Sequence, residues 1–117
     1  VDSARLLAGL LGQAAKAEQS FLAALTLAPD WLAAHNGVAA LYLEQDRPGD
    51  AMPHLLQAVE RGPNDPAVLS NLGRAYYACG QINQAIAQWQ QAQQLDPTVI
   101  TDKSIAVLIE EAARRKV

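Results

Sequence analysis

The sequence is poor in the residues that mark several common classes of protein. Its 117 residues include a single cysteine, Cys79, so the chain forms no internal disulfide and offers no cysteine-rich metal site. Aromatic residues make up only 5%, with one Phe, and valine and isoleucine are modest in number, which disfavours a β-rich fold. No run approaches the roughly 18 apolar residues of a membrane helix. The compartment stays open, with a soluble cytoplasmic protein preferred over a periplasmic one.

The chain also has no strong excess of either positive or negative charge. Twelve acidic and nine basic residues give a formal net charge of −3, without the basic excess that nucleic-acid binding requires. The one basic cluster, residues 114–116, ends the last predicted helix, where positive charge complements the helix dipole. We therefore expect no nucleic-acid partner and no direct membrane insertion. The chain begins at Val1 rather than Met, so we expect an excised or processed piece.

What the sequence does have is a helical hairpin at residues 66–97. Small and apolar residues recur at spacings of three and four on both sides of Gly80, which is typical of two amphipathic helices. Gly73 lies inside the first of them, where glycine costs roughly 1 kcal/mol relative to alanine. We expect Gly73 to answer a packing need opposite Ala85. The pattern consists of Leu69, Leu72, Gly73 and Tyr76, then Ala85, Trp89 and Ala92.

This hairpin repeats with a period of 34 residues. Pro97, Pro63 and Pro29 are separated by that step (97−63 and 63−29). The same step relates Trp89 to Leu55, and other pattern positions also fall on small or apolar residues. A fixed period of this size indicates an array of repeats.

The pattern resembles the tetratricopeptide repeat, and the resemblance covers most of the chain. It implies an all-α fold, an α-solenoid of antiparallel helix pairs, in one domain. It also implies a protein-binding module rather than an enzyme. We expect a degenerate first repeat at 1–30, a second at 31–64, a third at 65–98 and a C-terminal capping helix at 99–117. The residues that carry the resemblance are Leu72, Gly73, Tyr76, Ala85, Trp89, Ala92 and Pro97.

Breakers and caps predict seven helices. Gly12 is expected to end the first helix, and Asp30 to cap the helix at 31–45. Residues 46–49 read as a loop, and Pro53 implies that the following helix starts near Asp50 or bends at its start. Asp65 and Pro66 form a standard helix start. The capping helix is expected at 98–116, with the apolar stripe Ile105, Leu108, Ile109 and Ala112.

No catalytic group of residues stands out. His35 and His54 are 19 residues apart (54−35) on different predicted helices, and a metal site needs at least three ligands. Cys79 has no activating base near it in the repeat, so we interpret it as a buried or half-buried structural thiol. We expect no catalytic residue, no cofactor and no metal.

The resemblance implies a concave groove lined by the first helix of each repeat. Residues there that lie off the buried stripe are the candidate contacts for a peptide. Asparagine and arginine could bond a peptide backbone or carboxylate, and Tyr77 offers apolar contact. The alternative is a solvated helix face. The candidates are Asn36, Ala40, Leu43, Ser70, Asn71, Arg74, Tyr77 and Ser104, of which Asn36, Ser70 and Ser104 form a polar ladder with the 34-residue step.

Some members of the family clamp the C-terminal carboxylate of a chaperone with lysine, arginine and asparagine residues. At the lysine positions this chain has Asp2 and Ala67 in one alignment, and Asn36 and Thr101 in the alignment one repeat later. Acidic or neutral residues cannot pair with a carboxylate, so we expect no such clamp.

The predicted function is that of an adaptor or scaffold, which binds another protein or peptide in the groove. The first alternative is self-association into a homo-oligomer through the terminal helices. An exposed patch of Leu6, Leu7, Leu10 and Leu11 would mark that alternative. The second alternative is a regulatory appendage of a larger enzyme.

Overall fold

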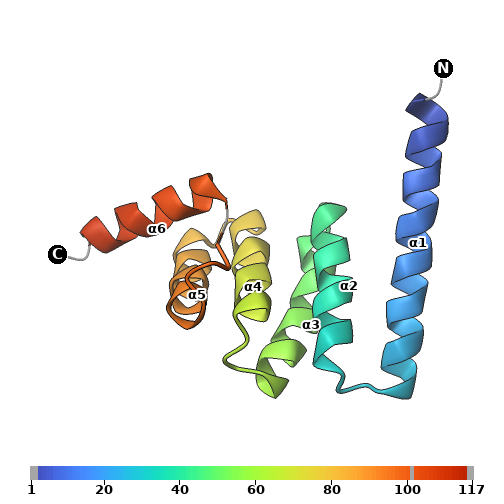
Figure 1. Cartoon of the computed structure of the whole chain (residues 1–117), viewed down its shortest axis with the longest axis horizontal. Coiled ribbons are helices and arrows are strands. Elements are labelled where there is room, and N and C mark those ends of the chain that lie inside the picture. Colours follow the sequence, from blue (N-terminus) through green and yellow to red (C-terminus); the bar gives the residue numbers. More distant parts are fainter. Residues whose placement is uncertain (1–2, 101, 116–117) are drawn as a thin grey trace.

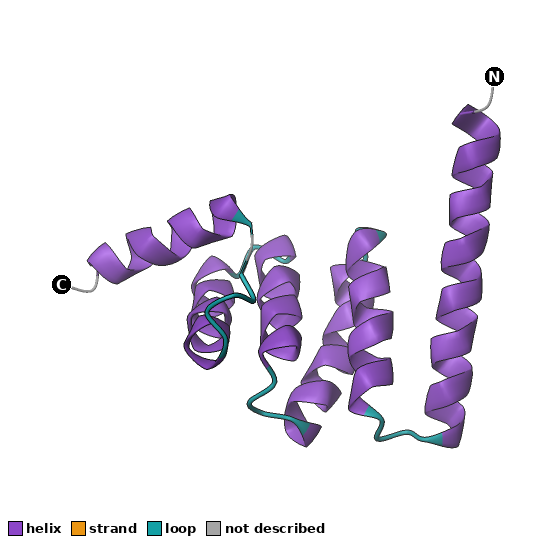
Figure 2. Cartoon of the chain, viewed as in Figure 1, coloured by secondary structure: helices purple, strands orange, loops and turns teal. Residues whose placement is uncertain are grey.

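The computed structural model describes residues 3–100 and 102–115, with the backbone alone for 3–11 and 115. Helices are the only regular elements among these residues (Figure 2). The all-α prediction is therefore confirmed. The helices are α1 (Ser3–Leu27), α2 (Leu32–Glu44), α3 (Pro48–Arg61), α4 (Pro66–Ala78), α5 (Ile82–Leu95) and α6 (Lys103–Arg115).

The helices follow one another across the molecule in chain order (Figure 1). α2 packs on α3 and α4 packs on α5 as two successive hairpins, and α3 packs on α4 to join them. α1 stands at one edge beside α2, and α6 leans away at the opposite edge (Figure 1). The molecule is elongated, with extents of 51 × 40 × 24 Å. This arrangement is that of an α-solenoid.

The junction between the two hairpins forms as the sequence predicts. The Asp65 carboxylate accepts hydrogen bonds from the backbone N–H groups of Ala67 (3.0 Å) and Val68 (3.4 Å). Pro66 takes the first helical position, where its missing N–H has no intrahelical partner to lose. Gly80 closes the turn between α4 and α5 at a φ of 82°. Three local signals therefore agree over a short stretch of chain.

The predicted break at Gly12 is wrong. α1 runs without interruption from Ser3 to Leu27, so the described residues form six helices rather than seven. A lone glycine costs a helix about 1 kcal/mol. The neighbouring leucine, glutamine and alanine residues favour helix, and no proline follows Gly12 to stop it. The penalty is too small to interrupt a helix of 25 residues.

Three other helices begin differently from the predictions of a cap at Asp30, a start near Asp50 and a start at Thr98. Asp30 does not cap α2, whose N-cap is Trp31; the Asp30 carboxylate pairs instead with Arg61 at 2.6 Å. α3 starts at Pro48 within the predicted loop and carries Pro53 in its interior. α6 starts at Lys103, because Asp96 holds Thr98 in a turn and Asp102 accepts a hydrogen bond from the Ser104 N–H.

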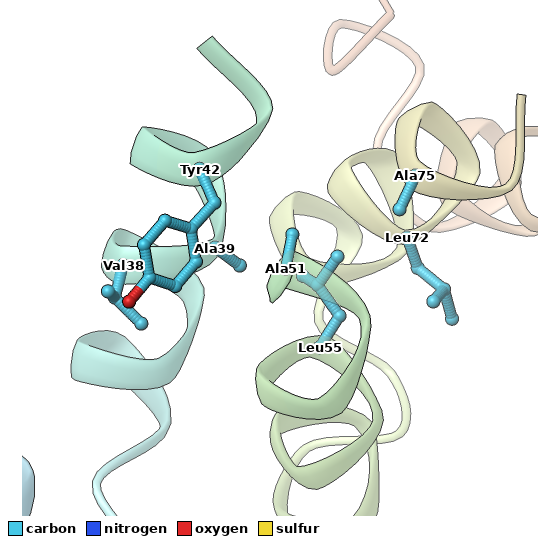
Figure 3. Packing of buried hydrophobic residues seen from close by; sticks show 7 residues of the cluster. All are labelled: Val38, Ala39, Tyr42, Ala51, Leu55, Leu72 and Ala75. Atoms are coloured by element: carbon cyan, nitrogen blue, oxygen red, sulfur yellow. The ribbon is translucent and has the colours of Figure 1, made fainter. Parts of the chain in front are cut away.

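The main core lies where α2, α3 and α4 meet (Figure 3). Leu55 of α3 is fully buried, and Ala51 one turn earlier lets the neighbouring helices approach closely. Burying a leucine side chain stabilises the fold by about 1.5–3 kcal/mol. The cluster consists of Val38, Ala39, Tyr42, Ala51, Leu55, Leu72 and Ala75.

A second cluster is centred on Trp89 of α5, which is 1% exposed. Its indole N–H donates to the backbone carbonyl of Ser70 at 3.1 Å. A Cβ atom on Gly73 would overlap the indole ring. Gly73 therefore answers a close approach as predicted, but the approaching group is Trp89 rather than Ala85. Ile109 of α6 packs on the same cluster.

α1 is held against α2 by both apolar and polar contacts. Phe21 fills the space over Gly37, where a Cβ atom would lie 2.6 Å from the ring. The Tyr42 hydroxyl donates to the Glu18 carboxylate at 2.9 Å. Burial, and then the bond to Glu18, raise the pKa of Tyr42 above its ordinary value. The Arg47 guanidinium lies 4.4 Å from the centre of the Tyr42 ring, which adds a cation–π contact.

Candidate functional site

The first helices of the successive units, α2, α4 and α6, bring several of the predicted groove residues together. A cavity of about 290 Å³ lies between α4 and α6. Its apolar lining comes from Leu43 of α2, Tyr77 and Ala78 of α4, Trp89 of α5, and Ile105 and Leu108 of α6. Its polar lining is Arg74, Asp102 and Ser104.

A second cavity of about 310 Å³ adjoins the first. Arg74, Asp102 and Ile105 line both cavities. The rest of the second lining comes from Ser70 of α4 and from Val99 and Ile100 of the α5–α6 connector. The two cavities therefore form one depression between α4 and α6. An arginine and an aspartate border both of its halves.

Three predicted residues form a hydrogen-bonded chain across the two hairpins. The Asn71 amide N–H donates to Asn36 Oδ1 at 2.8 Å, and Arg74 Nη1 donates to Asn71 Oδ1 at 3.2 Å. The first bond joins α2 to α4, and the second orients the arginine. Arg74 can donate further hydrogen bonds from its other nitrogens. Asn36 Oδ1 and Asn71 Oδ1 can each accept one more, because each has a second lone pair. Asn36 thus bonds Asn71, the residue next to Ser70 of the predicted ladder.

The structure places the eight predicted groove residues in three groups. Leu43, Arg74, Tyr77 and Ser104 line the first cavity, and Ser70 lines the second. Asn36 and Asn71 belong to the hydrogen-bonded chain beside them. Ala40 is half-buried on α2 and is not part of either lining.

Sequence reasoning missed Ala78, Trp89, Asp102 and Ile105 in the first cavity, and Val99 and Ile100 in the second. It assigned Trp89 and Ile105 to the buried stripe, and both also line the cavity. Tyr77 and Trp89 lie with ring centroids 5.8 Å apart, which makes one aromatic wall. The 34-residue step gave no signal for Asp102, because it relates that position to the buried Val68 (102−68).

The two histidines, which looked unrelated in the sequence, are in direct contact. Their Nδ1 atoms lie 3.0 Å apart, across the α2–α3 hairpin. His35 is 4% exposed, and its Nε2 atom is 2.7 Å from the backbone carbonyl of Pro29. Burial, followed by the charge of His35, lowers the pKa of His54 below its ordinary value. Ser70 and Trp89, also 19 residues apart (89−70), are in contact across the next hairpin.

The structure also bears on the predictions for Cys79, for a metal site and for a membrane-crossing helix. Cys79 is exposed at the end of α4, so the predicted burial of this thiol is wrong. The residues around the α4–α5 turn, 77–84, are all exposed, so the side chain lies in solvent. Among the described residues, no group of three or more His, Cys, Asp or Glu side chains could hold a metal ion. No helix in this part of the chain has a stretch long and apolar enough to cross a bilayer.

The successive antiparallel hairpins, with a depression lined by their first helices, define a helical-repeat solenoid. Residues 42–99 match the family model of the tetratricopeptide repeat, and the chain carries a domain of that family. Such domains are generally protein–protein interaction modules and are typically non-catalytic.

A solved structure of the "MamA RS-1 ArsTM double mutant" is similar to this chain. The TM-score is 0.69 at 25% sequence identity, and the match covers 92% of this chain and 70% of that one. The search of curated proteins found no match.

Proposed function

We propose that this domain is an adaptor or scaffold that binds a peptide or partner helix in the depression between α4 and α6. The observation that carries this proposal is the cavity of about 290 Å³, lined by side chains from α2, α4, α5 and α6. Ligand pockets range from roughly 300 to 1,000 Å³. A cavity at the low end of that range suits one bulky apolar side chain of a partner.

The lining supports an apolar anchor with polar neighbours. Leu43, Tyr77 and Leu108 offer apolar surface, and Tyr77 is 47% exposed, so a ligand would cover it. Burying apolar surface contributes about 25 cal/mol per Å² before the cost of association. Arg74 and Asp102 are both exposed at the border. The arginine can donate to carboxylates or backbone carbonyls, and the aspartate can accept from backbone N–H groups.

The hydrogen-bonded chain extends this surface toward α2. Because the Asn36–Asn71 bond joins two helices, the two amides are held at fixed positions. Fixed polar groups lose little entropy when a ligand binds. A peptide whose apolar side chain enters the cavity could therefore bond these amides with the adjacent stretch of its backbone.

The test begins with selection of peptides from a phage-displayed library on the 117-residue chain. The Kd of a selected peptide is then measured by fluorescence anisotropy for Tyr77→Ala and for Leu56→Ala. Leu56 is the matched control, because it is also 47% exposed but lies on α3 and not in the cavity lining. We expect Tyr77→Ala to weaken binding at least tenfold and Leu56→Ala to leave it unchanged. Equal effects would overturn the proposal.

Self-association is a second candidate, favoured by the exposure of α1. Among the described elements, α1 packs against α2 alone. Leu27 is 88% exposed and Leu22 is 39% exposed. The predicted marker, the leucines at 6, 7, 10 and 11, lies outside the described side chains. Light scattering over a range of concentrations tests this candidate: a constant 12.5 kDa species would exclude it, and a dimer would support it.

A further inference from the structure

The His35–His54 pair lies outside the proposed groove and ties three parts of the chain together. His35 is on α2, His54 is on α3, and the Pro29 carbonyl belongs to the connector that leads from α1 into α2. We propose that this pair is a proton-sensitive latch, which holds the α1–α2 connector on the α2–α3 hairpin at neutral pH and loosens it in mild acid.

The hydrogen bonds allow one proton arrangement in the neutral pair. A carbonyl oxygen only accepts, so His35 Nε2 carries the N–H that bonds Pro29. A neutral imidazole has one N–H, and His35 Nδ1 must therefore be an acceptor. The proton between the two Nδ1 atoms then belongs to His54. His54 Nε2 is left as the site for an additional proton.

The closed pair can take one additional proton but not two. A proton on His54 Nε2 leaves the bond between the Nδ1 atoms in place and makes its donor cationic. A second proton would have to enter at His35 Nδ1. It would remove the acceptor and set two positive rings against each other at 3.0 Å. Once the latch opens, both imidazoles can take up protons in water, so acid favours the open form.

The charged groups around the pair leave this effect uncompensated. Tyr42 of α2, whose ring centroid is 5.9 Å from that of His54, is bonded to Glu18 of α1 and is covered by Arg47. Asp50 of α3 bonds Arg47, and Asp30 of the connector bonds Arg61. On α4, Asp65 caps the helix and Arg74 bonds Asn71. None of these hydrogen bonds, all among described residues, places a carboxylate on either imidazole.

The direction of the pH effect follows from the lowered pKa of His54. The ordinary histidine pKa is about 6.5. As pH falls below that value, the open form binds more protons than the closed form, so closure weakens. The opening constant rises by at most tenfold per pH unit for each additional proton that the open form binds. Opening would loosen α1 and uncover the face of α2 that Phe21 now covers.

Hydrogen exchange of the 117-residue chain tests the latch. Opening constants for amides 32–38 of α2 and for α5 are compared at pH 6.5 and pH 5.5, after correction for intrinsic exchange. We expect an increase approaching tenfold in α2 and none in α5. His54→Gln is the matched variant. The side-chain amide of the glutamine can donate to His35 Nδ1, and after a flip its oxygen can accept from a protonated Nδ1. Its α2 amides should therefore show a flatter pH dependence.

An NMR titration of the imidazoles gives a second measurement that needs no variant. The chain has two histidines, so their signals are few and can be assigned. We expect the His54 signals to titrate at a pH below the ordinary histidine value, because burial lowers the pKa of this imidazole. A His54 step at or above that value would overturn the proposal. So would an opening constant in α2 that does not change with pH.

Discussion

Gly73 and Trp89 form the closest packing relationship of the α4–α5 hairpin. The indole ring occupies the space that a side chain at position 73 would need, and its N–H reaches the Ser70 carbonyl one turn earlier on the same helix. One glycine thus permits both the burial of the largest core side chain and the bond that fixes its orientation. The same indole forms part of the cavity wall, so the core and the proposed groove share a residue.

Replacing Gly73 tests this relationship. Gly73→Leu should force the indole out of its position, which we expect to cost about 3 kcal/mol or more in the free energy of unfolding. The corresponding fall in melting temperature is roughly 10–20 °C. Gly49→Leu is the control, since a Cβ atom on this helical glycine meets no atom within 4 Å. An unchanged melting temperature for Gly73→Leu would contradict the packing described here.

Two aspartates that look alike in the sequence should differ in their contribution to stability. Asp65→Ala removes a capping carboxylate that accepts two backbone N–H bonds, and we expect a loss of about 1 kcal/mol. Asp30→Ala removes only an ion pair whose side chains are 55% and 69% exposed, so we expect a loss of at most about 0.5 kcal/mol. Urea unfolding of both variants measures the difference. A larger effect at Asp30 would mean that it caps α2 after all.

The attachment of α1 can be tested at one hydroxyl group. Tyr42→Phe removes the donor to Glu18, whose side chain is 26% exposed, and we expect a loss of about 1.5 kcal/mol. Tyr76→Phe is the control, because no hydrogen bond of its hydroxyl is found within the described part of the chain. Thermal unfolding of the two variants is compared with the parent chain. Equal melting temperatures would show that the Tyr42–Glu18 bond contributes nothing.

Charge reversal at the border of the cavity should affect binding but not folding. Arg74 is exposed and bonds only Asn71 among the described residues, so Arg74→Glu should leave the melting temperature nearly unchanged. If a library-selected peptide presents an acidic group or a C-terminal carboxylate, its Kd should rise at least tenfold. Lys16→Glu, an exposed reversal on α1, makes the same change in net charge elsewhere. A similar loss with both variants would indicate a general electrostatic effect.

The sequence predicted the hairpins well where several local signals coincide. Asp65, Pro66 and the preceding proline and glycine all favour a helix junction, and α4 begins there. A single signal was less reliable. Gly12 on its own opposes helix by about 1 kcal/mol, and the surrounding helix-forming residues outweigh it. Asp30 could cap a helix, but its carboxylate bonds Arg61, which is 31 residues away and carries no local signal.

The candidate site was predicted in part for a related reason. The 34-residue step identifies the first helices, so it located Arg74, Tyr77 and Ser104, which line the cavity. The 34-residue step does not specify how far each helix is shifted along its axis relative to the neighbouring helix. The position of α6 depends on the Asp96 turn and the Asp102 cap, and these set which residues meet α4. The contact between His35 and His54 likewise depends on the relative shift of α2 and α3.

The central claim is that the depression between α4 and α6 is the binding surface. Its most direct test is a ¹⁵N-labelled NMR titration of the 117-residue chain with a library-selected peptide. The account predicts that the largest shift changes fall on the amides of Leu43, Arg74, Tyr77, Ile105 and Leu108. Shift changes confined to α1 or to the exposed face of α3 around Leu56 would contradict it.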